Sequence, residues 1–226
     1  SPVSNTDGSI TSTVKANPSY GFSITSFVGT GANATVGHGL SNAPDIVILK
    51  NRSIVSSWLV RTQVLAANQT LLLENTTTPI GTDYWQNTQP DSSVFSVSSN
   101  SEANGSGNNL IAYCFNSVAG YSSIGSYTGN GSASGPVVTT GFEPAFVMVK
   151  RSDGTGWWAI TDNTRSTVNT RSNTLAANEN YSEATLTSDL NIDFTSTGFQ
   201  IKDTDAYYNA SGGTYIYMAF ADTREA

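Results

Sequence analysis

The stretch Pro-Asp-Ile-Val-Ile-Leu-Lys at residues 44–50 returns 100 residues later as Pro-Ala-Phe-Val-Met-Val-Lys at residues 144–150. Each copy is a short, continuous apolar run between a proline and a lysine. This pattern is typical of a strand that is buried on both faces. Such a strand needs neighbours on each side, so the two copies predict a central strand in each half of the chain.

The similarity extends outward from these two strands, which indicates an internal duplication. The further matching pairs are 27–31 with 127–131, 58–60 with 158–160, 65–68 with 175–178, 95–97 with 199–201, and 104–115 with 209–220. Two homologous modules follow, which we place at 21–118 and 121–226. The polar residues 1–20 are expected to be a lead-in or linker.

The composition favours an all-β fold. The chain contains 31 serines, 29 threonines and 21 asparagines, and only 12% of its residues are charged, while aromatic residues still make up 10%. Polar turn residues combined with β-branched and aromatic residues are typical of short strands joined by turns. The sequence therefore predicts two tandem, homologous, jelly-roll-like β-sandwich domains.

The charge balance excludes some partners. Ten basic and 17 acidic residues give a net charge of −7, and no basic cluster is present, which argues against nucleic acid and against anionic membranes. No window of 18 apolar residues occurs, so we expect no membrane insertion. The first residues do not have the shape of a signal peptide.

The residue types that carry most catalysis are scarce. His38 is the single histidine and lies in a predicted turn, and Cys114, the single cysteine, matches Ala219 in the repeat. We therefore expect a loop histidine and a buried, inert thiol. The sequence predicts no catalytic residue, no metal site and no cofactor.

Two acidic pairs are the alternatives to this interpretation. Asp83 and Asp91 flank Tyr84-Trp85 and could form a glycosidase pair, and Asp203 with Asp205 has the alternating spacing of calcium ligands. We favour solvated loop carboxylates at both places. Asn104 and Asn209 recur between the modules as parts of glycosylation sequons, and we interpret them as Asx turns before a glycine.

Aromatic residues that differ between the modules are the predicted recognition residues. Trp58 and Trp158 recur and are interpreted as core packing. Rings without a counterpart, Tyr181 among them, lie near predicted loops, where they could stack on sugars while polar neighbours bind the hydroxyls. Burial against a neighbouring module or subunit is an equally weighted alternative. The predicted ligand-binding residues are Tyr84, Trp85, Asp91, Trp157, Tyr207 and Tyr208.

Several longer stretches resemble one known family. They include Asn-Thr-Asp-Gly-Ser-Ile-Thr-Ser at 5–12, Gly-His-Gly-Leu-Ser-Asn-Ala-Pro at 37–44, Ile-Ala-Tyr-Cys-Phe at 111–115 and Gly-Ser-Tyr-Thr-Gly-Asn-Gly-Ser at 125–132. Over nearly its whole length the chain is similar to a tandem-repeat domain of uncharacterised function. That domain lies at the carboxyl end of tail-fibre-like virion proteins of marine and other bacteriophages.

The resemblance implies a place on a virion and an upstream part to which residues 1–20 would be the linker. It implies no catalytic or binding residue. We therefore expect a non-enzymatic phage appendage module that forms a homotrimer, as tail appendages commonly do. It would adsorb to a bacterial surface glycan or receptor and contact other virion proteins. A head-decoration or structural fibre protein is the alternative, and a depolymerase ranks last.

Overall fold

The computed structural model describes residues 1–183 and 190–222, and it confirms the all-β fold class. The chain divides into two compact units, each built from two β-sheets. The first unit contains residues 1–73 and 79–116, and the second contains residues 74–78 and 117–226.

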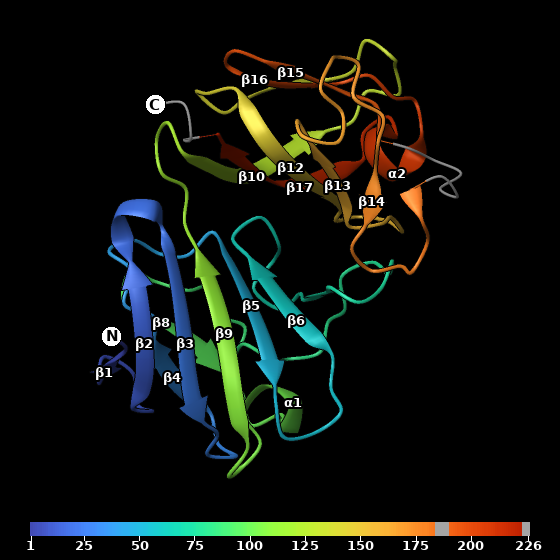
Figure 1. The fold of residues 1–226 in the computed structure, drawn as a ribbon. Coiled ribbons are helices and arrows are strands. Elements are labelled where there is room, and N and C mark those ends of the chain that lie inside the picture. The colour runs from blue at the N-terminus through green and yellow to red at the C-terminus, as the bar shows by residue number, and fades with distance from the viewer. Residues whose placement is uncertain (184–189, 223–226) are drawn as a thin grey trace. The chain divides into compact units, whose positions relative to one another are not determined.

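The first unit pairs a seven-stranded sheet, in the order β1-β2-β3-β9-β5-β6-β7, with a two-stranded sheet of β4 and β8. Figure 1 shows β4 and β8 behind the larger sheet. All pairings between neighbouring strands are antiparallel. The elements are β1 (Val3–Asn5), β2 (Ser12–Asn17), the 3-10 turn Pro18–Tyr20, β3 (Phe22–Val28), β4 (Ala34–Gly37), β5 (Ile46–Asn51), β6 (Trp58–Thr62), β7 (Leu71–Leu72), β8 (Val94–Val97), α1 (Ser101–Asn104) and β9 (Asn109–Phe115).

The second unit pairs a five-stranded sheet, in the order β10-β17-β12-β13-β14, with a three-stranded sheet in the order β11-β16-β15. Its pairings are also antiparallel. The elements are β10 (Ser122–Thr128), β11 (Val137–Thr139), β12 (Pro144–Arg151), β13 (Ala159–Asp162), β14 (Leu175–Ala176), β15 (Ile192–Thr195), β16 (Gly198–Ile201), α2 (Ala206–Asn209) and β17 (Thr214–Ala221).

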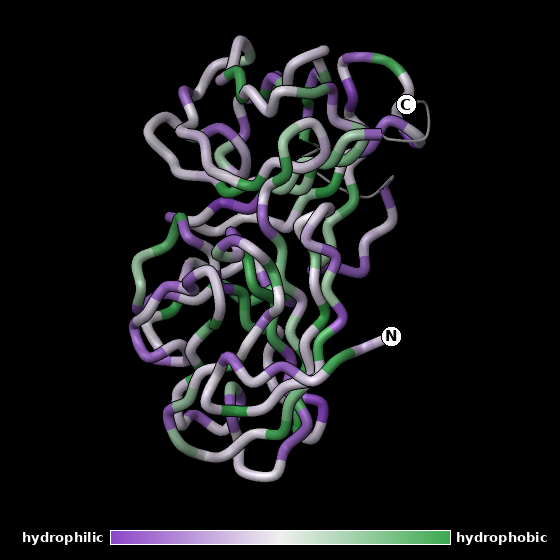
Figure 2. Tube along the Cα trace, turned by 90° about the vertical axis from the view of Figure 1, so that its left-hand side faces the viewer, coloured by the Kyte–Doolittle hydropathy of each residue, from purple (hydrophilic) through white to green (hydrophobic). Residues whose placement is uncertain are grey.

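Alternation along the strands produces one apolar core in each unit. In β9, Leu110, Ala112 and Cys114 are fully buried and belong to the core of the first unit. Val147 and Val149 of β12 have the same role in the second unit. Figure 2 shows hydrophobic residues recurring along the strands and hydrophilic residues in many of the loops. These cores supply most of the driving force for folding, since burial contributes about 25 cal/mol per Å² of apolar surface.

The lead-in predicted over residues 1–20 is wrong as a description of the structure, because these residues carry two strands of the first sheet. β2 pairs with β3 over five residue pairs, and β1 pairs with β2. Val14 is 2% exposed, because β2 turns alternate side chains toward the core. The second unit has no described counterpart of these two strands.

The predicted match of residues 65–68 with 175–178 is also wrong. Leu71 and Leu72 pair with Val60 and Leu59 of β6, in the way that residues 175 and 176 pair with β13. The equivalent strands are therefore 104 residues apart, and the shared letters Leu-Ala-Ala-Asn are a coincidence of composition. Strand register is the better guide here, because a slip in register would exchange the buried and exposed faces.

The asparagine that recurs in each unit forms hydrogen bonds with a turn far away in the sequence, at residues 30–32 or 130–132. Asn104 is fully buried, its side chain accepts a hydrogen bond from the Thr30 nitrogen (2.9 Å), and it donates one to the Ala32 carbonyl (2.6 Å). Asn209 makes the equivalent bonds with the Asn130 nitrogen (2.7 Å) and the Ser132 carbonyl (2.8 Å). These bonds replace the local Asx turn that the sequence suggested, and they satisfy a polar group inside the fold.

Both recurring asparagines end a four-residue helix that the sequence did not predict. The side chain of Asn100 accepts a hydrogen bond from the Glu102 nitrogen at the start of α1, and Asp205 does the same for Tyr207 at the start of α2. Within residues 1–183 and 190–222, no helix is long and apolar enough to cross a membrane.

Candidate functional site

Four of the six predicted ligand-binding side chains are buried, and this corrects the expectation that they lie on open loops. Trp85 is 2% exposed, Tyr208 is fully buried, and Tyr84 and Trp157 are less than a tenth exposed. Tyr84 and Trp85 belong to the core of the first unit, and the other two belong to the core of the second. These rings are therefore not available to a ligand.

The physical reason is that each sandwich closes its core with its own loop. The Trp85 ring lies inside the first unit, and its indole nitrogen donates a 2.8 Å hydrogen bond to the buried Thr70 hydroxyl. A ring of this size stabilises the fold most when it is inside and its single donor is satisfied. Trp85 therefore lacks a counterpart in the second module because the two cores are filled by different side chains. Its absence from the repeat does not indicate an exposed recognition residue.

The remaining two predicted residues reach the surface. Asp91 is exposed, but its carboxylate accepts hydrogen bonds from the backbone nitrogens of Ser93 and Val94. These bonds, the Val94 bond first, hold the pKa of Asp91 below its usual value. Tyr207 is partly exposed and stacks on Trp157, with ring centroids 5.1 Å apart.

Tyr207 belongs to a small aromatic cluster of the second unit. Tyr181, which is 53% exposed, meets the edge of Trp157 with ring centroids 6.4 Å apart. At the equivalent place in the first unit, Ser57 donates its backbone nitrogen to the Glu102 carboxylate at 3.4 Å. The cluster is therefore a specific feature of the second unit, and its exposed part consists of the two tyrosines.

His38 has a structural role that the repeat makes visible. It is fully buried, its Nδ1 accepts a hydrogen bond from the Leu40 nitrogen, and its Nε2 bonds to the Asp91 carbonyl at 3.1 Å. In the second unit, the Thr140 hydroxyl accepts from the Phe142 nitrogen in the same way. The imidazole thus fixes a turn, and burial lowers its pKa below 6.5.

The acidic pairs considered for catalysis or calcium serve as backbone acceptors. Asp83 accepts hydrogen bonds from the nitrogens of Trp85 and Asn87. Asp203 accepts from the Asp205 nitrogen and from Asn191. Among the described residues, no group of three or more His, Cys, Asp or Glu side chains is arranged to hold a metal ion. Cys114 is buried, and desolvation raises the pKa of its thiol to about 12.

The outer face of the seven-stranded sheet is the best candidate for a binding surface. Side chains that alternate with the core residues point away from the core, and strand register arranges them in rows. One row runs Thr13, Ser26, Ile111, Lys50 and Trp58, and the next runs Lys15, Ile24, Tyr113, Ile48 and Val60. Every residue of these rows except Val60 is at least partly exposed, so the sheet presents a mixed apolar and polar surface.

Trp58 and Tyr113 form an aromatic pair on this face. They come from β6 and β9, the strands on either side of β5, and their rings stack with centroids 6.5 Å apart. The Lys50 ammonium lies 5.6 Å from the Trp58 ring and donates a hydrogen bond to the Ser56 carbonyl. Such a pair offers flat apolar surface beside a positive charge.

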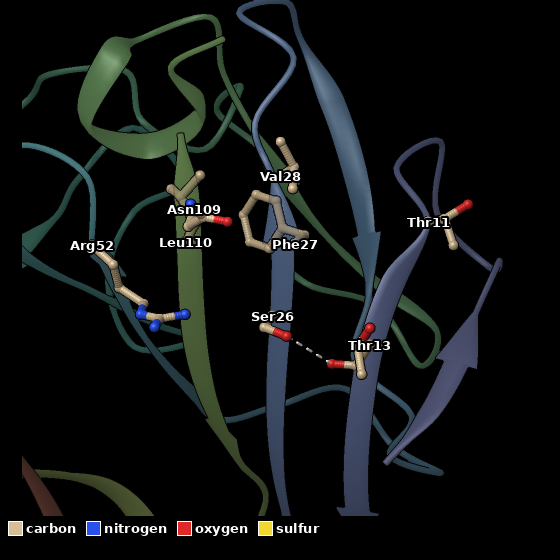
Figure 3. Close-up of a pocket in the computed structure, with 8 residues that line it drawn as sticks. All are labelled: Thr11, Thr13, Ser26, Phe27, Val28, Arg52, Asn109 and Leu110. Atoms are coloured by element: carbon tan, nitrogen blue, oxygen red, sulfur yellow. Dashed lines mark hydrogen bonds between the residues drawn. The ribbon is translucent and has the colours of Figure 1, made fainter. Parts of the chain in front are cut away.

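A polar groove with a volume of about 180 Å³ lies over β2, β3 and β9 of the same sheet. Figure 3 shows the guanidinium of Arg52 reaching over β9, with Ser26 and Thr13 on the next two strands. The Ser26 hydroxyl lies 3.5 Å from the Thr13 carbonyl. The groove is lined by Thr11, Thr13, Ser26, Phe27, Val28, Arg52, Asn109 and Leu110. Hydroxyl, amide and guanidinium groups side by side are the donors and acceptors that recognise hydroxylated ligands.

Part of the equivalent face of the second unit is buried. Trp158, Ile216 and Met218 are all at most 5% exposed, although they occupy the places of Trp58, Ile111 and Tyr113. Ser152 stands where the first unit has Arg52.

Part of this burial comes from residues 74–78. The buried Lys150 donates hydrogen bonds to the carbonyls of Thr76 (3.2 Å) and Thr77 (3.1 Å), and the Gly156 nitrogen donates to Thr76 at 3.0 Å. Burial, with the charge of Arg151 next in importance, lowers the pKa of Lys150 to about 8.

The sequence reasoning missed this site because Trp58 recurs as Trp158 and was therefore interpreted as core packing. The available signal was alternation: Trp58, Val60 and Thr62 have the opposite phase to the core residue Leu59. In a two-sheet sandwich, the second sheet covers only one face of the first. A sheet with apolar residues on both faces therefore has one apolar face outside the sandwich core. The sequence does not say which copy keeps that face open.

The chain belongs to the family described as "Domain of unknown function (DUF7483)", whose pattern matches residues 1–224. No match was found among curated proteins or among solved structures.

Proposed function

We propose that this DUF7483 chain is a non-enzymatic adhesion module of a phage tail appendage, which binds bacterial surface glycans through the outer face of its first unit. The observation that carries the proposal is the contrast between the copies. The Trp58–Tyr113 pair is partly exposed and a polar groove lies on the same sheet, while Trp158 and Met218, which occupy the places of the pair in the second unit, are buried.

The chemistry of the face suits a sugar. Partly exposed aromatic rings can stack on the apolar face of a hexose, and nearby hydroxyl and amide groups can bond its hydroxyls. The open, shallow shape predicts weak binding at one site. Several copies on one particle would convert weak sites into useful avidity.

The virion assignment rests on the resemblance of residues 5–12, 37–44 and 111–115 to tail-fibre-like proteins, and a homotrimer is the proposed assembly. The proposed partners are a host glycan and other virion proteins, with no role for nucleic acid or membrane insertion.

The test is adsorption of the fluorescently labelled chain to host cells and to their extracted polysaccharide. Trp58→Ala should weaken binding at least tenfold, because it removes the stacking surface. Tyr113→Met is the matched variant, since it installs the residue of the second unit and should weaken binding less.

Leu175→Ala, on a partly exposed side chain of the second unit, is the control and should bind normally. If the wild-type chain at high valency does not adsorb, or if Trp58→Ala adsorbs equally well, the proposal is wrong. A head-decoration or structural fibre role would then be favoured. Shortening of the polysaccharide during incubation would instead point to a depolymerase.

A further inference from the structure

We propose that the glycan bound on this face is acidic, and that Arg52, Lys15 and Lys50 bind its carboxylates. This inference rests on the proposed function, because it names the ligand class of the same site. It is carried by the placement of charge on the first unit, not by the aromatic pair.

The three cations stand without counter-ions in an acidic protein. The chain has 17 acidic and 10 basic residues, yet no carboxylate lies within 4.0 Å of Lys15, Lys50 or Arg52 in residues 1–183 and 190–222. No acidic residue occupies either outer-face row. Glu102, on α1, accepts a hydrogen bond from the Ser57 nitrogen.

The second unit treats its cations in the opposite way. Each of its partly exposed, described cations has a carboxylate partner, while Lys150 and Arg171 are buried. The ion pairs are Arg151 with Asp153, Arg165 with Asp162 and Glu183, and Lys202 with Asp193. Because the same fold pairs its cations elsewhere, the unpaired set on one face of the first unit is a local property of that face.

The spacing of the cations suits a chain with repeated carboxylates. Lys15 and Lys50 lie on β2 and β5 with two strands between them, and in neighbouring rows two residues apart, so their backbones are about 16 Å apart at the usual strand spacing and rise. Arg52 is two residues beyond Lys50 and overhangs the groove (Figure 3). Cations therefore stand on both sides of the Thr13 and Ser26 hydroxyls.

Arg52 has the chemistry to choose a carboxylate. Its exposed guanidinium can bind both oxygens of one carboxylate at once, and this geometry gives specificity as well as attraction. Lys50 already donates to the Ser56 carbonyl, which fixes its ammonium beside Trp58. An ammonium has three donors, so a carboxylate can still be accepted there.

Polygalacturonate and its fully methyl-esterified form are the probes, because they share one sugar backbone and differ in charge. Affinity electrophoresis of the full chain should show at least tenfold tighter binding to the acid form. Arg52→Ser installs the residue of the second unit, and it should weaken binding to the acid form about fivefold to tenfold while leaving the ester unchanged.

Lys202→Ser is the charge-matched control, since it removes one cation from the second unit and should change neither affinity. Circular dichroism would verify that each variant is folded. Equal binding of the acid and the ester, with both lost in Trp58→Ala, would overturn the acidic preference and leave the proposed function intact. If Arg52→Ser weakens binding to the acid form no more than Lys202→Ser does, the role of Arg52 is overturned.

Duplex DNA is a third probe in the same experiment. If the chain binds DNA as tightly as it binds polygalacturonate, the face is a general polyanion-binding surface and the inference is overturned. If the chain binds neither the acid nor the ester, the inference fails, and adsorption to the host polysaccharide decides the glycan-binding function separately.

Discussion

The two units use one strand plan and treat the same sheet face in opposite ways. Lys50 and Trp58 stand on an open surface of the first unit, whereas Lys150 and Trp158 are 1% exposed in the second. The cores meanwhile keep the same pattern, and the buried asparagines make the same bonds. The difference teaches that the duplication preserved the central strands and the asparagines that fix the turns, while the outer face diverged.

Divergence on that face needs few changes. Arg52 in place of Ser152 and Tyr113 in place of Met218 give the first unit a cation and a ring that the second unit lacks at these two places. The cores differ as well, since Tyr215 and Tyr217 stand where the first unit has Leu110 and Ala112, and such changes of volume need compensating changes around them.

The largest expected difference is in the free energy of unfolding when Trp58 or Trp158 is replaced by alanine. Trp158→Ala should destabilise the second unit by about 3–5 kcal/mol, since it removes a fully buried ring. Trp58→Ala should cost about 1 kcal/mol, since part of its ring already contacts water. Urea unfolding followed by circular dichroism measures both. Equal losses would break the comparison, because they would mean that both faces are closed.

The next effect concerns the two lysines. Lys150→Met should destabilise the second unit by about 1–3 kcal/mol, because the carbonyls of Thr76 and Thr77 lose their donor. Lys50→Met should cost less than about 1 kcal/mol, since Lys50 is partly exposed and donates to a single carbonyl.

Cleavage after Glu74 by a glutamate-specific protease gives a local readout of this difference. It should be faster in Lys150→Met than in the wild-type chain and unchanged in Lys50→Met. Unchanged cleavage in both variants would show that Lys150 does not hold residues 74–78 in place.

The smallest effect compares His38 with Thr140. Burial lowers the pKa of His38 below 6.5, and the charges of Asp91 and Asp7, which act on the ring, offset only part of this. The unfolded chain therefore binds a proton more readily than the folded one. Stability of the first unit should fall as the pH drops through about 6.5, with a slope of at most about 1.4 kcal/mol per pH unit.

His38→Thr installs the residue of the second unit and should remove this slope between pH 7 and pH 5. Urea midpoints at several pH values measure it. A slope that persists in His38→Thr would assign the acid sensitivity to other groups, of which Asp91 is the nearest.

Sequence reasoning was most successful where the repeat and the apolar runs agreed. Residues 44–50 and 144–150 predicted central strands, and β5 and β12 lie between β9 and β6 and between β17 and β13. It failed for Tyr84, Trp85, Trp157 and Tyr208, which plug the cores. An aromatic ring in a loop can point inward or outward, and local sequence does not distinguish the two.

The sequence by itself determined the duplication, the all-β class, the acidic charge and the alternation that makes the sheets apolar on both faces. These are properties of order and composition, and they follow from the two-residue period of a strand. Only the tertiary structure decided which outer face is open, because exposure depends on segments far away in the chain. Residues 74–78 bond to Lys150 in the second unit, and no short-range pattern around Lys50 or Lys150 encodes that contact.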